Sequence, residues 1–299
     1  MVDYAKKVGD IRVDGKVIAI TGATSGLGKA SALELARRGA TLALINRNPE
    51  KARATKRDIE RAVPEATVHL FDADLSSLAQ VRRAGGAMCA TLPRLDAFIS
   101  NAGYVATGFR PSAEGWDEML VTNHLGPFLL IHQVLGLLKA SRPSRIVTTV
   151  SGAYRMIKTF DPEHMEQIGD YSTLGNRLRA YGHTKLLQVM MADELARRLE
   201  GRGVTARSQC PGAVASEGAA AETVLIFRII TKLYVDPAKA CMKTVWLASD
   251  PALDRITGEH YPSWPGVMWL KESPFRHNEA LARRVYERSC ELVGVEPVH

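Results

Sequence analysis

A glycine-rich stretch decides the fold, and it reads Thr21-Gly22-Ala23-Thr24-Ser25-Gly26-Leu27-Gly28. It follows Val17-Ile18-Ala19-Ile20, a short apolar run typical of a buried strand, and it opens a helical segment that ends near Gly39. Glycines let the backbone approach a ligand, and a helix that begins there offers free N–H groups and a positive dipole end. The order strand, loop, helix therefore predicts a pyrophosphate site. The spacing differs from the commoner G-x-G-x-x-G fingerprint, so a turn that only packs the helix on the strand is the alternative.

The alternation of short apolar runs and longer helical segments continues along the chain. We expect strands at 41–45, 68–71, 95–99, 145–150 and 204–208, and helices at 26–38, 49–62, 78–90, 113–140 and 177–200. Strands that are apolar on both faces and separated by helices predict a parallel sheet with helices on both faces. The expected fold class is α/β, a single doubly wound Rossmann-type domain over residues 1–299. Such sheets bind ligands beyond the carboxyl ends of their strands.

The composition excludes several classes of protein. The 299 residues are 46% hydrophobic and 24% charged, which is typical of a globular chain and not of a disordered one. No run approaches the roughly 18 apolar residues of a membrane span, and the polar N-terminus lacks the apolar core of a secretion signal. Four widely spaced cysteines argue against a zinc site or a disulfide framework. These features predict a cytoplasmic protein with no metal and no integral membrane segment.

The net charge of +7 raises the question of a nucleic-acid partner. Basic pairs such as Arg37-Arg38 and Arg197-Arg198 are isolated, and no aromatic residues alternate with them as in a single-strand binding surface. Solvated helix faces explain these pairs better, so we expect no nucleic-acid partner.

Polar and small residues follow the next strands. Asn46-Arg47 ends the second strand, where an acid would bind the ribose 2′-hydroxyl and an arginine accommodates a 2′-phosphate. Arg47 therefore favours NADP(H) over NAD(H), unless it only solvates the strand end. Asp72 and Asp74 follow the third strand and suit the adenine amino group. Asn101-Ala102-Gly103 follows the fourth strand and is small enough for a cofactor to lie against the sheet.

A tyrosine and a lysine follow the fifth strand, which ends at Val150-Ser151. Tyr181 and Lys185 are four residues apart, so they share one face of a helix. A tyrosine with a pKa of about 10 is a poor acid or base near neutrality, but a nearby ammonium favours the phenolate and lowers that pKa. Taken alone, such a pair is more often an ordinary surface feature.

The motifs occur together and in one order: the glycine stretch, Asp74-Leu75, Asn101-Ala102-Gly103, Asn123, Ser151, Tyr181/Lys185 and Pro211-Gly212. In this combination the chain resembles the short-chain dehydrogenase/reductase family over about residues 15–262. The run Asn123-His124-Leu125-Gly126-Pro127-Phe128-Leu129-Leu130 looks most like the retinol-dehydrogenase-like branch.

The resemblance implies four catalytic residues. Tyr181 would be the general acid/base, Lys185 would bind the nicotinamide ribose and lower the tyrosine pKa, and Ser151 would hydrogen-bond the substrate oxygen. Asn123 would hold the long helix and a water that relays protons through Lys185. The cofactor-binding residues implied, besides Tyr181 and Lys185, are Gly22, Thr24, Ser25, Gly26, Leu27, Gly28, Asn46, Arg47, Asp74, Leu75, Asn101, Ala102, Gly103, Pro211, Gly212, Val214 and Ser216.

The substrate side is less regular. The gap of 30 residues between Ser151 and Tyr181 exceeds the family's common spacing, and residues 154–176 are expected to extend a loop over the substrate. The variable segment at about 213–236 is aliphatic, which implies a lipophilic substrate such as a terpenoid, steroid, retinoid or polyketide-like alcohol or ketone. An oligomer contact and an interfacial membrane helix are its alternatives. The extension at about 263–299 ends in an expected amphipathic helix that closes the domain or contacts a neighbour.

Three functions are compatible with the sequence. The first is an NADP(H)-dependent oxidoreductase that interconverts a lipophilic alcohol and its ketone or aldehyde. The second is a dehydratase or isomerase without net redox turnover, and the third is a non-catalytic dinucleotide-binding protein. The complete set Asn123, Ser151, Tyr181 and Lys185 weighs against the third, while fold alone does not separate the first two. The family resemblance favours a homodimer or homotetramer.

Overall fold

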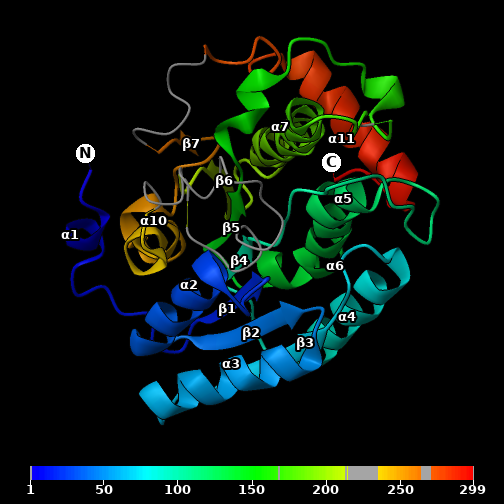
Figure 1. The fold of residues 1–299 in the computed structure, drawn as a ribbon. Helices are drawn as coiled ribbons and strands as arrows, with labels where there is room; N and C mark the ends of the chain where they lie inside the picture. Colours follow the sequence, from blue (N-terminus) through cyan, green and yellow to red (C-terminus); the bar gives the residue numbers. More distant parts are fainter. Residues whose placement is uncertain (1, 168, 213, 215–234, 264–270, 299) are drawn as a thin grey trace.

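A parallel sheet forms the centre of the molecule. The computed structural model describes residues 2–167, 169–212, 214, 235–263 and 271–298. The sheet has seven strands in the order β3-β2-β1-β4-β5-β6-β7, and all neighbouring pairs are parallel (Figure 1). The strands are β1 (Val17–Thr21), β2 (Thr41–Asn46), β3 (Val68–Asp72), β4 (Ala97–Ser100), β5 (Ser144–Thr149), β6 (Val204–Gln209) and β7 (His260–Tyr261). The strand order reverses between β1 and β4, which is the switch point where doubly wound sheets bind ligands. The predicted fold class is confirmed.

Alternate strand residues feed two separate hydrophobic cores, which explains why the strands are apolar on both faces. Val17 and Ala19 of β1 pack into the core that contains residues of the helices α4 (Leu78–Thr91), α6 (Gly126–Ala140), α7 (Leu174–Arg198) and α11 (Glu279–Val293). Ile18 and Ile20 pack into the opposite core, with residues of α2 (Gly26–Arg37), α3 (Pro49–Ala62) and α10 (Pro237–Ser249). Period-two alternation in a strand that is covered on both sides gives this division.

The principal helices follow the predicted order. They are α1 (Tyr4–Val8), α2 (Gly26–Arg37), α3 (Pro49–Ala62), α4 (Leu78–Thr91), α5 (Glu118–Leu120), α6 (Gly126–Ala140), α7 (Leu174–Arg198), α10 (Pro237–Ser249) and α11 (Glu279–Val293). Short helical turns are η1 (Val121–Leu125), η2 (Gly152–Met156), η3 (Pro162–His164) and η5 (Pro251–Leu253). α7 begins three residues before its predicted start at Arg177, because Thr173 caps it by accepting a hydrogen bond from the Asn176 N–H at 3.2 Å.

The long helix predicted at 113–140 begins only at Glu118, so that boundary was wrong. Pro111 forms an antiparallel bridge with Asp117, and the Asp117 carboxylate accepts a hydrogen bond from the Met119 N–H at 2.8 Å. A turn therefore occupies the first positions of the predicted helix. Beyond Leu120 the helix widens into the π-helical turn η1 before it continues as α6. Such turns are rare in proteins as a whole, but where they occur they are often at functional sites.

The stretch Glu118–Ala140 is long and apolar enough to cross a membrane by length and composition, with a mean hydropathy of 1.2. However, 72% of the window that meets this criterion is buried inside the fold. Its apolar side chains, among them Phe128 and Leu129, belong to the core against the sheet. Packing into this core explains why the helix is so apolar.

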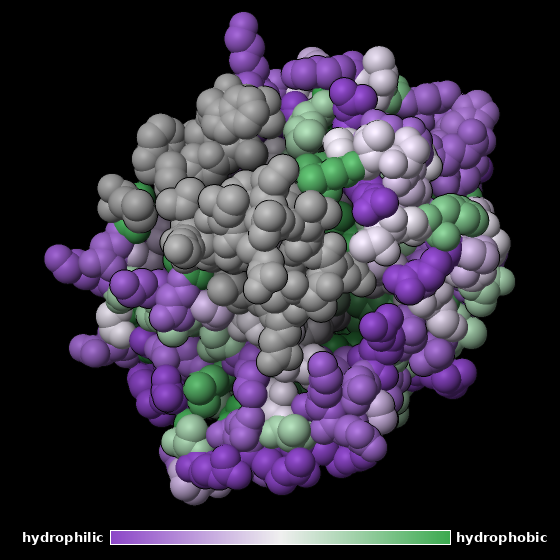
Figure 2. Space-filling view, in the orientation of Figure 1, coloured by the Kyte–Doolittle hydropathy of each residue, from purple (hydrophilic) through white to green (hydrophobic). Residues whose placement is uncertain are grey.

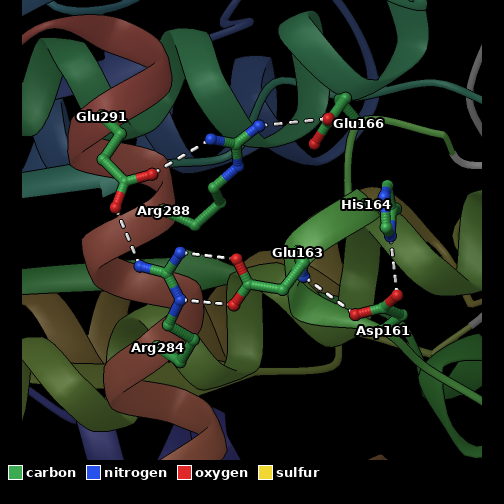
Figure 3. Close-up of polar contacts among 7 residues, drawn as sticks. All are labelled: Asp161, Glu163, His164, Glu166, Arg284, Arg288 and Glu291. Atoms are coloured by element: carbon green, nitrogen blue, oxygen red, sulfur yellow. Dashed lines mark hydrogen bonds and ion pairs between the residues drawn. The ribbon is translucent and has the colours of Figure 1, made fainter.

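The C-terminal helix α11 lies beside α7 and against the segment that contains η3 (Figures 1 and 3). Arg284 binds both carboxylate oxygens of Glu163, at 2.5 and 2.6 Å, and Glu291 at 2.8 Å. Arg288 bridges Glu291 and Glu166 at 3.0 and 3.1 Å. α11 thereby fixes residues of the long insertion between Ser151 and Tyr181.

The inner face of α11 is also polar at two points. The Tyr286 hydroxyl lies 2.7 Å from Nε2 of His132, and the Ser289 hydroxyl lies 2.9 Å from Nε2 of His124. Burial lowers the pKa of His124 to about 3, so its imidazole is neutral at physiological pH. The predicted amphipathic helix thus packs on its own chain, and His124 serves packing and hydrogen bonding.

The described surface carries only scattered apolar residues. Hydrophilic residues cover most of the described part of the face drawn in Figure 2. Among the described residues, the large apolar side chains that are exposed are Val2, Phe109, Val235 and Ile256. Single exposed apolar residues of this kind are normal for globular proteins.

Candidate active site

The glycine loop after β1 is shaped to leave space at the start of α2. Gly22 and Gly26 have φ values of +69° and +50°, which side chains other than glycine rarely adopt. A Cβ on Gly28 would lie 2.3 Å from the Gly22 carbonyl oxygen, so only glycine fits there. Ser25 is the N-cap residue, yet its side chain makes no capping hydrogen bond. The first N–H groups of α2 are therefore not capped by the Ser25 side chain, and the helix dipole makes this end of α2 positive; half-buried Thr24 lies in the same loop.

The ends of β2 and β3 lie beside this loop. Buried Asn46 accepts a hydrogen bond from the Ala23 N–H at 2.8 Å, which ties the strand end to the glycine loop. The next side chain, Arg47, is 66% exposed, with its guanidinium 3.9 Å from the Glu118 carboxylate. After β3, Asp74 accepts hydrogen bonds from both the N–H and the hydroxyl of Ser76, at 2.9 and 2.7 Å.

The segments that follow β1 and β4 are joined by hydrogen bonds. The Thr21 hydroxyl accepts from the backbone N–H groups of Asn101 and Ala102 at 2.9 and 3.0 Å. The Asn101 side chain donates to the carbonyl oxygens of Thr21 and Gly22 at 3.0 and 3.3 Å. These contacts bring predicted cofactor residues from two distant stretches of the sequence into one edge of the sheet. Leu75, after β3, lies close to Gly126 at the start of α6, where a Cβ would be 2.2 Å from the Leu75 carbonyl oxygen.

Asn123 lies in the π-helical turn η1 and is completely buried. Its amide oxygen accepts from the Tyr104 N–H, and its amide nitrogen donates to the Tyr104 carbonyl oxygen, both at 3.0 Å. The same nitrogen donates to the Thr184 hydroxyl at 3.0 Å. Asn123 therefore connects the segment after β4 with the helix that carries Tyr181 and Lys185.

Ser151, Tyr181 and Lys185 meet at the carboxyl end of β5. Lys185 is 3% exposed, and its ammonium lies 5.4 Å from the centre of the Tyr181 ring. The ammonium donates to the Gln188 side-chain oxygen at 2.7 Å and to the Thr149 carbonyl oxygen at 3.4 Å. A Cβ on Gly103 would lie 3.2 Å from this ammonium, so glycine leaves space beside it.

Burial dominates the electrostatics of the pair. It lowers the pKa of Lys185 to about 7, although the Cys210 thiol acts to raise it. Burial also raises the pKa of Tyr181, while the hydrogen bond between Ser151 and the phenol acts to lower it. The resemblance implied a lowered tyrosine pKa; with the protein's own groups alone, the shift is upward. Desolvation penalises the charged forms of both side chains, and it is the largest cause of each shift.

The chain after β6 completes the described part of the site. Gly212 has a φ of +87°, and it follows Pro211 directly. Val214 forms a parallel bridge with Val235 and packs against the cluster of Leu27, Ala240 and Cys241. Ser216, and most of the predicted substrate-covering segment at 213–236, lie outside the described residues. Within the part of the chain that the structure describes, no group of three or more His, Cys, Asp or Glu residues is arranged to hold a metal ion.

The chain matches known proteins over nearly its whole length. A family model described as short chain dehydrogenase matches residues 16–160. Retinol dehydrogenase 11 from Homo sapiens is 32% identical over 291 residues, which cover 95% of this chain and 88% of the relative. Dehydrogenase/reductase SDR family member 13 from Homo sapiens is 34% identical, with 97% and 76% covered. The chain belongs to the short-chain dehydrogenase family.

Solved structures show the same fold. An uncharacterised protein from Mycobacterium paratuberculosis superposes with a TM-score of 0.74 at 26% identity, with 97% of each chain covered. A protein described as an NAD(P)-dependent gluconate 5-dehydrogenase from Beutenbergia cavernae, with bound NADP, has a TM-score of 0.69 at 25% identity, with 85% of this chain and 97% of the other covered. As a short-chain dehydrogenase, the protein is an NAD(P)-dependent oxidoreductase that acts on CH–OH groups. Within the family it belongs to the retinol-dehydrogenase-like branch.

Two polar residues of this short-chain dehydrogenase were not predicted from the sequence. Gln188 contacts the Lys185 ammonium, as described above. Lys243 of α10 is buried, and its ammonium donates to the carbonyl oxygens of Cys210 and Pro262 at 2.9 and 2.8 Å and to the Ser263 hydroxyl at 2.8 Å. It thus holds the start of the Pro211-Gly212 turn. A lysine within the apolar face of a helix is the one sequence signal that would have suggested it.

Proposed function

We propose that the protein is an NADP(H)-dependent oxidoreductase that interconverts a lipophilic alcohol and its ketone or aldehyde, with Tyr181 as the general acid/base. The main observation that supports this function is that Ser151, Tyr181 and Lys185 converge at the carboxyl end of β5. The glycine loop lies along the same edge of the sheet, joined to it through Asn101.

The described residues fit a nicotinamide dinucleotide. The start of α2 suits a pyrophosphate, because the Ser25 side chain does not cap its N–H groups and glycine at position 28 lets the helix start pack closely against Gly22 and Asn101. Glycine at position 103 keeps a side chain away from the Lys185 ammonium, which suits binding of that ammonium to a hydroxyl of the nicotinamide ribose. When bound, the cofactor supplies or accepts the hydride.

The protein's own groups handle the proton. The raised pKa of Tyr181 keeps its phenol protonated at neutral pH, which suits donation to a carbonyl oxygen as the substrate is reduced. The Ser151 hydroxyl donates a hydrogen bond to the same oxygen and stabilises its developing charge. A protonated Lys185 favours the phenolate that remains, so it lowers the cost of the transfer. In the direction of oxidation, the phenolate accepts the proton from the alcohol.

Arg47 supports a preference for NADP(H). Its side chain is mostly exposed at the end of β2. Neither of the two residues there, Asn46 and Arg47, is acidic, whereas an acidic residue at this place would bind a ribose 2′-hydroxyl. Arg47→Asp should weaken NADPH binding far more than NADH binding, measured by nucleotide fluorescence titration. Arg57→Asp makes the same charge change at an exposed position on α3 and should affect both nucleotides equally. Equal losses for both nucleotides in Arg47→Asp would refute the preference.

The lipophilic substrate is supported by the relatives and by the aliphatic segment at 213–236. Several of the relatives are retinol dehydrogenases by name. A panel of aliphatic, terpenoid, steroid and retinoid carbonyls, assayed by the nicotinamide absorbance change with each cofactor, tests this assignment. Sugar-acid ketones are the polar control, since a structural neighbour is described as a gluconate dehydrogenase. Turnover of the polar compounds with none of the lipophilic ones would contradict it. Conversion of a substrate with no change in nicotinamide absorbance would support dehydration or isomerisation instead.

We also infer that residues 1–299 form one domain, with a core at about 15–262 and an extension at about 263–299. β7 pairs with β6, and α11 packs into the core that α6 and α7 share. The two large hydrophobic cores of the described residues lie on the two faces of the one sheet.

A further inference from the structure

Gln188 stands out among the polar residues near the site because it is completely buried and contacts the catalytic lysine. It lies one turn beyond Lys185 on α7, and its side-chain oxygen accepts from the Lys185 ammonium at 2.7 Å. The ammonium's other hydrogen bond, to the Thr149 carbonyl oxygen, is longer at 3.4 Å. The Gln188 side-chain nitrogen has no partner among the described residues, so the contact with Lys185 is the one hydrogen bond of this amide.

A lysine ammonium has three protons to donate, so three acceptors can bind it. Gln188 and Thr149 accept two of them. Gly103 lies close to the ammonium, since a Cβ on Gly103 would be only 3.2 Å from its nitrogen. The nearby Asn123 side-chain oxygen already accepts from the Tyr104 N–H. One proton of the ammonium therefore has no acceptor among the described residues and is available to a ligand.

We propose that Gln188 is the positioning residue for Lys185: its oxygen holds the ammonium beside Gly103, with one N–H directed at the cofactor ribose. This inference rests on the proposed function for the identity of the ligand, while the contact itself belongs to the protein alone.

A neutral acceptor is also the chemistry that this position needs. The groups that face Lys185 are Tyr181 on its own helix, Cys210 after β6, and the uncharged Thr149 and Asn123. The structure shows no carboxylate acting on its pKa, which burial lowers to about 7. The Gln188 oxygen favours the charged form of the lysine, since it accepts from the ammonium. It does so without fixing a permanent negative charge beside the cofactor.

Two substitutions of similar size separate this role from simple packing. Gln188→Met removes the acceptor and should lower the pKa of Lys185 by roughly one unit, whereas Gln188→Glu adds a carboxylate and should raise it by at least about that much. The pKa is measured in the full chain without nucleotide, by NMR titration of ¹³C-labelled lysine side chains, with the resonance assigned through Lys185→Arg. Gln209→Met is the matched control, because Gln209 is equally buried and donates to Thr149 and Thr244 without touching Lys185.

The pH dependence of NADPH binding provides the second readout. Binding should weaken as Lys185 loses its proton, so the midpoint should move to lower pH in Gln188→Met and to higher pH in Gln188→Glu. Opposite shifts in the two variants, with the midpoint unchanged in Gln209→Met, support the proposal. Identical lysine titrations in wild type and both Gln188 variants overturn it. If Gln188→Met does not fold, Gln188→Glu decides alone, and the absence of an upward shift overturns the proposal. Failure of the wild type to bind NADPH would contradict the proposed function, while the lysine titration would still decide the role of Gln188.

Discussion

Asn123→Leu removes the polar connection between the segment after β4 and α7. Leucine keeps the branched shape of asparagine and is somewhat larger, so the substitution opens no cavity and removes the hydrogen bonds of the side chain. The wild-type side chain makes three of them at 3.0 Å, two with the backbone of Tyr104 and one with the Thr184 hydroxyl. Thr184 keeps a partner in the variant, since its hydroxyl also donates to the Tyr181 carbonyl oxygen at 2.8 Å. The Tyr104 N–H and carbonyl lose theirs.

The cost follows from these contacts. A typical hydrogen bond contributes about 1 kcal/mol net, and a buried group left without a partner costs about 1–3 kcal/mol. Tyr104 is only half-buried, so water can reach part of its backbone and the lower values apply. We expect Asn123→Leu to lower the free energy of unfolding by about 3 kcal/mol, which corresponds to a fall in melting temperature of roughly 5–10 °C.

Thermal and urea unfolding followed by circular dichroism provide the assay. Thr122→Val is the matched control, because the neighbouring Thr122 hydroxyl is buried and has no hydrogen-bond partner among the described residues. Its removal should leave stability within about 0.5 kcal/mol of wild type. An Asn123→Leu variant as stable as Thr122→Val would refute the argument that Asn123 holds these two segments together.

Two further variants test the loop and the charge distribution. Gly28→Ala should abolish nucleotide binding and lower the melting temperature, because the alanine Cβ would lie 2.3 Å from the Gly22 carbonyl oxygen and 2.6 Å from the Asn101 amide nitrogen. Unchanged NADPH affinity, measured by titration, would show that the loop does not hold the cofactor. Asp193→Asn should stabilise the protein at neutral pH, because burial raises the pKa of Asp193 to about 6 despite Arg276 at 3.8 Å. The stability that neutral Asp193 contributes to the fold is fully present below its ordinary pKa of 3.8, and it is lost as pH rises through about 6. The gain should therefore be on the order of 2–3 kcal/mol at about pH 7.5 and near zero at about pH 4. A lower melting temperature of Asp193→Asn at the higher pH would contradict this sign.

The features that the sequence predicted well are those with a local pattern. The strands, the glycine loop and the four-residue spacing of Tyr181 and Lys185 each depend on neighbours in the chain, so they could be recognised without a structure. The start of the long helix was missed because its apolar periodicity extends into residues 113–117, where Asp117 caps the helix and the preceding residues turn back.

Gln188 and Lys243 could not be predicted because their roles depend on distant partners. The acceptors of Lys243 come from the ends of β6 and β7, which only the folded sheet brings together. The direction of the Tyr181 pKa shift was also beyond the sequence, since it depends on how much of the phenol and the ammonium the fold withdraws from water.

The central claim is that the Tyr181 phenol transfers the proton during carbonyl reduction, and Tyr181→Phe tests it most directly. NADPH affinity and reduction of a substrate identified from the carbonyl panel would be measured on wild type, Tyr181→Phe and the control Tyr171→Phe, which loses a hydroxyl that donates to Asp117. The account predicts wild-type NADPH affinity for Tyr181→Phe with no turnover above background, and substantial turnover for Tyr171→Phe. Reduction by Tyr181→Phe at a rate near that of the wild type would contradict it.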